Sequence, residues 1–239
     1  MAARIKILGA VLAAIGVLFV IGGGVAFAMV RDGAHSLQSF SEAQNVTLSY
    51  NEDGELVDRG TTEQAQEILS LLEDDWGYAV KSWELDPDDP LVNTGSEYMY
   101  QMALISYHVM HGAQSITLDE DVEYNGEVFP AGTYEIVPAE EFAVDGEIMH
   151  GYWTDFDRMH PIEGPARSGA WTGTAHGLIA ELGVGSVTAS TLQMGYGIAA
   201  FIAGVGATLV LTGAGLYWAA GAAPVAAPAA AKPKAKAKK

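Results

Sequence analysis

The chain has 239 residues and no cysteine, so disulfide bonds and metal or redox chemistry based on thiols are excluded. Its net charge at neutral pH is −18, and the charges are segregated along the chain. All 30 acidic residues lie between Asp32 and Glu181, whereas seven of the 12 basic residues lie near the two ends. The charge pattern therefore predicts an acidic central domain between two flanking segments of different character.

The flanking segments contain two long apolar runs, residues 7–30 and 194–222, and neither run contains a charged side chain. Each run exceeds the roughly 20 residues that a helix needs to cross the ~30 Å hydrocarbon core of a bilayer. Tyr196 lies near the start of the second run, and Tyr217 and Trp218 lie near its end, as aromatic side chains do at membrane interfaces. Both runs are therefore predicted to be transmembrane helices in contact with membrane lipids.

The basic residues predict how the two spans are oriented in a plasma membrane. Residues 1–6 and 223–239 carry seven Lys and Arg, so the positive-inside rule places both termini in the cytoplasm and residues 31–193 outside. The sequence AFA at residues 26–28 resembles a signal-peptidase site. The apolar run before it is longer than the roughly 7–15 residues of a signal-peptide core, so an uncleaved anchor is the favoured interpretation.

The C-terminal tail, residues 223–239, is a low-complexity mixture of Ala, Pro and Lys that is predicted to be disordered. Its five Lys would lie just inside the membrane, where they are expected to bind anionic lipid. Nucleic acid is a less favoured partner because no aromatic or Arg side chain is interleaved with these Lys.

Small residues recur every four positions in the second span, at Ala200, Gly204 and Thr208. Such a stripe gives a helix a smooth face that another backbone can approach closely in lipid. Either the stripe packs the two spans of one chain together, or it docks onto another membrane protein or a second copy of this chain. Neither span contains an ionisable side chain, so neither is predicted to form an ion or proton pathway.

Residues 31–193 are numerous enough to form one domain with its own core. Alternating residues about an Asp-Gly turn predict a hairpin at residues 46–60. Capping-box spacing predicts helices that begin at Thr61 and at Thr94. The second of these, ending near Gly112, is apolar on nearly all sides and is predicted to be the centre of the fold.

The second half of the domain begins with hairpin signals. Asn125-Gly126, between two short β-prone segments, is the strongest of them, and residues 133–137 predict a third strand. Residues 152–176 have no regular period and predict a long loop, after which a short helix near residues 175–183 leads back to the membrane. Helices segregated from antiparallel hairpins predict an α+β extracytoplasmic domain between two transmembrane helices.

His108 and His111 are three positions apart near the end of the predicted central helix, so they share a face. A His pair with a carboxylate is the minimum set for non-haem iron, and three protein ligands with an open position suit catalytic zinc. No spaced metal motif accompanies the pair, so the alternative is two partly buried His near a helix C-terminus, and no cofactor is predicted. The side chains that could complete a metal site are Glu97, Asp155, Asp157, His160, Glu163 and His176.

The predicted loop at residues 152–176 combines Trp, Arg and acidic side chains with Pro and Gly. Buried Trp and bidentate Arg–carboxylate pairs would make it a packed structural loop, which is the first interpretation. A partner-docking surface is the second, because Trp and Arg are common interface anchors, and catalysis is the third. The predicted docking residues are Trp153, Arg158, Arg167 and Trp171.

Residues 58–78, 86–102, 121–135 and 152–185 together resemble a group of actinobacterial two-span membrane proteins. The resemblance extends from the first span through the second. It implies a domain held between two membrane helices. Members of the group often carry the label aromatic ring-opening dioxygenase, and that label implies an iron site built from His and carboxylate ligands.

The sequence leads to two main hypotheses. In the first, the protein is an accessory or scaffolding subunit of a membrane assembly, and its acidic outer domain binds a partner. In the second, it is a metal-dependent enzyme, similar to a ring-opening dioxygenase, that uses His108, His111 and a carboxylate. A cation sensor ranks last, because a short disordered tail is a poor cytoplasmic effector.

Overall fold

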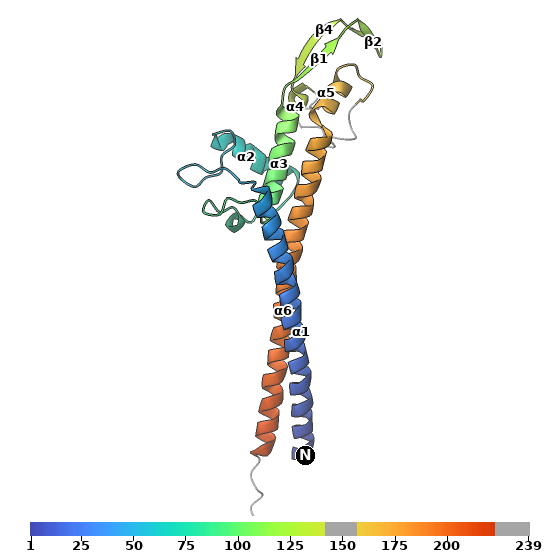
Figure 1. The fold of residues 1–239 in the computed structure, drawn as a ribbon. Coiled ribbons are helices and arrows are strands. Elements are labelled where there is room, and N and C mark those ends of the chain that lie inside the picture. Colours follow the sequence, from blue (N-terminus) through green and yellow to red (C-terminus); the bar gives the residue numbers. More distant parts are fainter. Residues whose placement is uncertain (142–156, 223–239) are drawn as a thin grey trace, which may run out of the picture. The chain divides into compact units, whose positions relative to one another are not determined.

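A computed structural model describes residues 1–141 and 157–222, which form two compact units (Figure 1). One unit contains residues 1–31 together with the chain from Met194 onward, and the other is formed by residues 32–193. Two long helices, α1 (Ala2–Gln44) and α6 (Gly173–Gly221), contribute to both units. Within the described residues, these are the two helices that are long and apolar enough to cross a membrane, by length and composition.

In the first unit, α1 and α6 lie side by side and run in opposite directions (Figure 1). Gly9 near the start of α1 faces Gly213, whereas Gly23 faces Ala203. Both helices continue beyond their apolar runs, so α1 also supplies residues 32–44 to the second unit and α6 supplies residues 173–193.

The prediction of a separate short helix at residues 175–183 is wrong. These residues are the first turns of α6, which is continuous for 49 residues. Glycine at position 185 does not end the helix, because its role is in packing: a Cβ added to Gly185 would lie 2.6–2.8 Å from the ring of Tyr98. Close contact with a neighbouring helix, rather than a chain turn, explains the glycine there.

Helix α3 (Gly95–His111) supplies the centre of the main core of the second unit, as the sequence predicts. Its capping box is confirmed: the Thr94 hydroxyl accepts from the Glu97 amide, and the Glu97 carboxylate accepts from the Thr94 amide. The buried members of this core come from five parts of the chain and are Leu48, Leu56, Ala65, Ile68, Leu71, Leu72, Val92, Tyr98, Tyr100, Ala103, Leu182 and Ala189.

Helix α2 (Thr62–Ser70) packs on α3 and continues into the π-helical turn η1 (Leu71–Asp75). The predicted helix start is confirmed, because the Thr61 side chain accepts a hydrogen bond from the Gln64 amide. The chain leaves the helix at Gly77, whose φ of +64° suits glycine. A short 3-10 turn, η2 (Ser82–Glu84), leads toward α3.

The strands form two small antiparallel sheets. Strand β1 (Gln114–Leu118) pairs with β4 (Gly132–Ile136), and β2 (Val122–Tyr124) pairs with β3 (Glu127–Phe129). The predicted turn is confirmed, with φ of 53° at Asn125 and 85° at Gly126. The fold is therefore mostly helical with small antiparallel sheets, a coarser form of the α+β prediction.

The predicted hairpin at residues 46–60 is a tight turn with little regular strand. Tyr50 and Leu56 form an isolated antiparallel bridge, and Gly54 has a φ of +79° within the turn. The Asn51 side chain accepts from the amides of Asp53 and Glu55 and so shapes the turn itself.

The prediction of a loop across residues 152–176 is partly wrong, because helix α5 (Glu163–Ala170) lies within it. Pro and Gly in the segment EGPARSGA hide the helix from a propensity argument, yet Ala166, Arg167 and Ala170 form a buried face. Helix α4 (Pro138–Glu141) precedes it, and a second core cluster joins Met110, Ala139, Trp171 and Ala175.

Candidate functional site

A seam of glycines joins α1 and α6 in the first unit. A Cβ added at Gly16 would lie 2.6 Å from the carbonyl oxygen of Gly206. One added at Gly206 would lie 2.6 Å from the amide nitrogen of Val20, and one at Gly213 would lie 2.5 Å from the oxygen of Gly9. A side-chain carbon essentially never comes within 3.0 Å of such atoms, so the two backbones are in direct contact and only glycine fits.

The seam has a period of seven residues. Seven residues are close to two helical turns, so the repeating positions stay on one face of each helix. Close backbone packing of this kind holds helices together in lipid, where the hydrophobic effect does not favour helix association. The four-residue period of the predicted stripe does not coincide with this seven-residue period, which is present in the sequence as repeated glycines. The seam positions are Gly9, Gly16 and Gly23 on α1, and Ala199, Gly206 and Gly213 on α6.

The predicted packing stripe lies on another side of α6. Ala200, Gly204 and Thr208 are all exposed, and among the described residues nothing lies within 4 Å of a Cβ added at Gly204. At about 100° per residue, Gly204 and the seam residue Gly206 point to nearly opposite sides of the helix. The interpretation that the stripe joins the two spans is therefore wrong, and the docking interpretation stays a prediction.

The outward side of α6 is uneven as well as apolar. Gly204 leaves a hollow, and the side chain of Phe201, 72 % exposed, stands beside it. The Thr208 hydroxyl donates to the carbonyl of Gly204 one turn earlier, so this hydroxyl of the stripe has its donor satisfied within the helix. The residues that line this shallow groove are Phe201, Gly204, Val205, Thr208 and Leu209.

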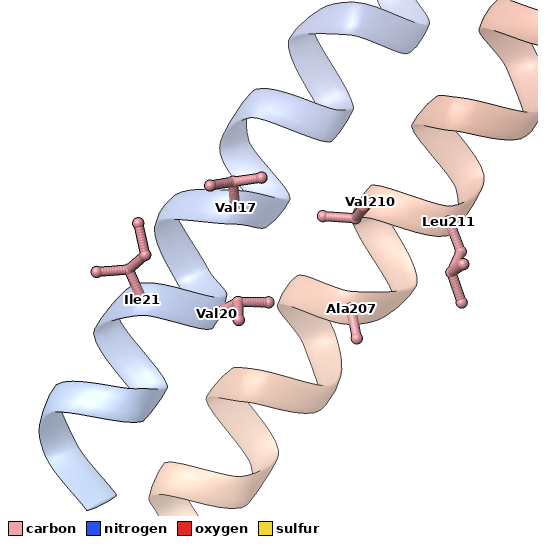
Figure 2. Close-up of a pocket in the computed structure, with 6 residues that line it drawn as sticks. All are labelled: Val17, Val20, Ile21, Ala207, Val210 and Leu211. Carbon is pink, nitrogen blue, oxygen red and sulfur yellow. The ribbon is translucent and has the colours of Figure 1, made fainter. Parts of the chain in front are cut away.

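A second groove lies between α1 and α6, beside the glycine seam (Figure 2). Only aliphatic side chains line it, so it offers no group that could bind a polar ligand or take part in catalysis. Its chemistry matches a hydrocarbon chain. The lining residues are Val17, Val20, Ile21, Ala207, Val210 and Leu211.

A polar cluster around the buried Glu84 ties the turn η2 to α3 and α6 in the second unit. The Glu84 carboxylate accepts from the Ser96 amide at 2.9 Å, from Gln193 Nε2 at 2.7 Å and from Lys81 Nζ at 3.1 Å. Burial pulls the pKa of Glu84 upward, but these hydrogen bonds outweigh burial and hold the pKa below its ordinary value. Glu84 is 5 % exposed, and its hydrogen bonds join η2 to α3 and to α6.

The two histidines of the proposed metal site have separate partners. His108 Nε2 lies 2.8 Å from Oδ2 of the buried Asp58, whereas the His111 ring stacks on Tyr107 and its Nδ1 lies 2.8 Å from the Tyr107 carbonyl oxygen. Nearby, burial and then the charge of Asp58 raise the pKa of the Tyr100 hydroxyl. Within residues 1–141 and 157–222, no three His, Asp or Glu side chains are arranged to hold a metal ion.

The other candidate metal ligands take part in local structure. The Glu97 carboxylate caps α3, and burial raises its pKa against the opposing hydrogen bonds from Asn93 and Thr94. His160 Nδ1 accepts from the amides of Ile162 and Glu163 at the start of α5. Asp157 accepts from the Tyr124 hydroxyl, Glu163 pairs with Arg167, and the His176 ring lies against Trp171. Asp155 lies outside the described residues.

The predicted docking residues differ in their surroundings. Arg167 is 1 % exposed and pairs with Glu163, and Trp171 is 8 % exposed and donates from Nε1 to the sulfur of Met110. Neither side chain is therefore presented to a partner in this conformation. Arg158 is exposed, so its docking role stays a prediction, and Trp153 lies outside the described residues, as does the Lys-rich tail.

Comparison with known proteins found no matching family model, no matching curated protein and no matching solved structure. The described residues that can contact other molecules include the exposed face of α6 around Gly204, the aliphatic groove between α1 and α6, and the surface of the acidic unit.

Proposed function

We propose that the protein is a two-pass membrane protein that serves as an accessory or scaffolding subunit of a membrane assembly. Both termini lie in the cytoplasm, and the acidic unit formed by residues 32–193 lies outside the cell. The side of α6 opposite the glycine seam docks onto a membrane-protein partner or a second copy of the chain. The acidic unit contributes further contacts, with Arg158 as one candidate.

The single observation that carries this proposal is the unused small-residue face of α6. The glycines at 9, 16, 206 and 213 are all needed for contact between α1 and α6. Gly204 has no such contact among the described residues, yet it opens a hollow at the same level of the helix pair. A helix backbone can approach such a hollow closely, and that approach is the main source of helix affinity in lipid.

Charge supports the orientation. The basic residues at both ends favour the cytoplasmic side, and the strongly acidic middle disfavours contact with an anionic inner leaflet. The same acidic surface favours a partner with basic groups, because complementary charge raises the rate of association.

The test compares two glycine-to-leucine variants of the full chain. Gly204→Leu fills the hollow, whereas Gly22→Leu makes the same change on α1, where nothing among the described residues lies within 4 Å. The two positions lie at a similar depth, because the neighbouring Gly23 faces Ala203. The matched pair thus separates loss of docking from a general effect of an added leucine.

Each variant is purified gently from the membranes of its own cells, and the stoichiometry of every co-purifying protein is measured. A second copy of the chain with a different tag reports self-association. We expect Gly204→Leu to lose a near one-to-one partner that wild type and Gly22→Leu retain. If wild type is recovered alone in several detergents, or if Gly204→Leu keeps its partner, the docking proposal fails.

A further inference from the structure

The turn η2 projects a tryptophan into solvent. Trp83 is 77 % exposed, although the residue that follows it, Glu84, is only 5 % exposed. A large exposed aromatic ring gains free energy when another phase or partner covers it. Trp is also the side chain most typical of the boundary between lipid and water. The turn therefore presents the right chemistry for a membrane surface.

The tether of this turn sets its level along α6. Lys81 Nζ donates to Gln193 Oε1 at 2.7 Å, and Gln193 Nε2 donates to Glu84 Oε1 at 2.7 Å. These two bonds attach the residues on either side of Trp83 to the same glutamine. Gln193 is the residue immediately before Met194, where the apolar run of α6 begins. The residues that flank Trp83 are thus bonded to the side chain that immediately precedes the apolar run.

The charges around the turn select the kind of lipid. Asp86, Asp88 and Asp89 follow it closely and are exposed, and the nearby Lys81 is already engaged with Glu84 and Gln193. Anionic headgroups would be repelled by these carboxylates. A neutral, zwitterionic lipid surface avoids that repulsion and still accepts an indole ring.

We propose that η2 is a membrane-contacting turn, in which Trp83 inserts into the interfacial layer of the bilayer beside α6. The inference rests on the proposed insertion of the two spans. It adds a third point of lipid contact, and this contact orients the acidic unit relative to the bilayer. The bonds from Lys81 and Glu84 to Gln193 are what fix the turn at that depth.

The experiment measures depth with spin labels on the full chain in phosphatidylcholine vesicles. The absence of cysteine allows single labels without background. Ser82→Cys places a label beside the intact Trp83, Val128→Cys in β3 gives a water reference, and Leu18→Cys on α1 gives a lipid reference. Collision rates with oxygen, which concentrates in lipid, and with a nickel chelate, which stays in water, report the depth of each label.

We expect the oxygen-to-nickel ratio at Ser82→Cys to lie between the two references, and to fall toward the water reference when Trp83→Ala is added. A ratio at Ser82→Cys equal to that at Val128→Cys, with Leu18→Cys in lipid, would overturn this inference and leave the two-span proposal standing. A water-like ratio at Leu18→Cys would overturn both.

Discussion

Adding one carbon atom within the glycine seam should weaken the association of α1 with α6. Gly206→Ala adds one Cβ, which would lie 2.6 Å from the amide nitrogen of Val20 and 2.7 Å from the carbonyl oxygen of Gly16. Both obstacles are backbone atoms, so no side-chain rotation can relieve the clash. Gly204→Ala is the matched control, because the same Cβ meets nothing within 4 Å among the described residues.

The magnitude follows from the distances. Ordinary van der Waals contact begins near 3.4 Å, so α1 and α6 must separate locally by about 0.8 Å to accept the new atom. A gap of that size forfeits roughly a quarter to a half of the dispersion energy of the atoms that line it. We expect Gly206→Ala to cost about 1–3 kcal/mol of helix association, as overpacking does elsewhere. Gly204→Ala should change stability by less than about 0.5 kcal/mol.

The assay is reversible unfolding of the full chain in mixed micelles of dodecyl maltoside and dodecyl sulfate. Because the chain lacks cysteine, donor and acceptor dyes at Ala2→Cys and Ala222→Cys report separation of the two spans by loss of energy transfer. The midpoint for Gly206→Ala should fall well below those of wild type and Gly204→Ala. Equal midpoints for the two alanine variants, or a lower midpoint for Gly204→Ala, would refute the inference that the glycine seam stabilises the contact between α1 and α6.

Two further predictions concern the second unit. The folded pKa of Glu84 lies below its ordinary value, so the stability that this carboxylate contributes is present above the unfolded pKa and is lost as pH falls through the folded pKa. In thermal melts from neutral to acidic pH, we therefore expect the Glu84→Gln variant to lose less stability on the acid side than wild type. Identical pH slopes for the two proteins would contradict this expectation. Trp171→Ala should cost about 3–5 kcal/mol of unfolding free energy because the Trp171 ring is buried. Trp83 is exposed, so Trp83→Ala should leave the denaturant midpoint of the second unit unchanged. An unchanged midpoint for Trp171→Ala would favour the docking interpretation instead.

Local signals in the sequence were sufficient where a single interaction decides the structure. The capping box at Thr94 and Glu97 starts α3 because the two groups satisfy each other within one turn. The Asn125-Gly126 turn forms because both residues accept positive φ values. The two long helices are likewise expected from uninterrupted apolar runs. Each of these features depends on residues that are neighbours in the chain.

Features that depend on distant partners were not predictable in the same way. Helix α5 forms despite its Pro and Gly because Arg167 and Ala166 are buried, and propensity does not contain that information. The sequence around Trp171 is compatible with an interface anchor and with a core residue. Its contact with Met110 shows that it is a core residue in this structure. His108 and His111 share a helix face, yet His108 pairs with Asp58 and His111 stacks on Tyr107.

The sequence by itself thus determined which segments are apolar enough to span a bilayer, where the helices of the domain begin and where its hairpins turn, because those properties depend on composition and short-range contacts. Only the tertiary structure decided which small residues carry the helix contact. Gly204 and Gly206 are the same residue type, but among the described residues nothing lies within 4 Å of a Cβ added at Gly204, whereas Gly206 faces the backbone of α1. The physical reason is that the role of a glycine depends on which atoms a side chain at its position would meet. For Gly206 the nearest such atom is the amide nitrogen of Val20, nearly 190 residues away in the chain.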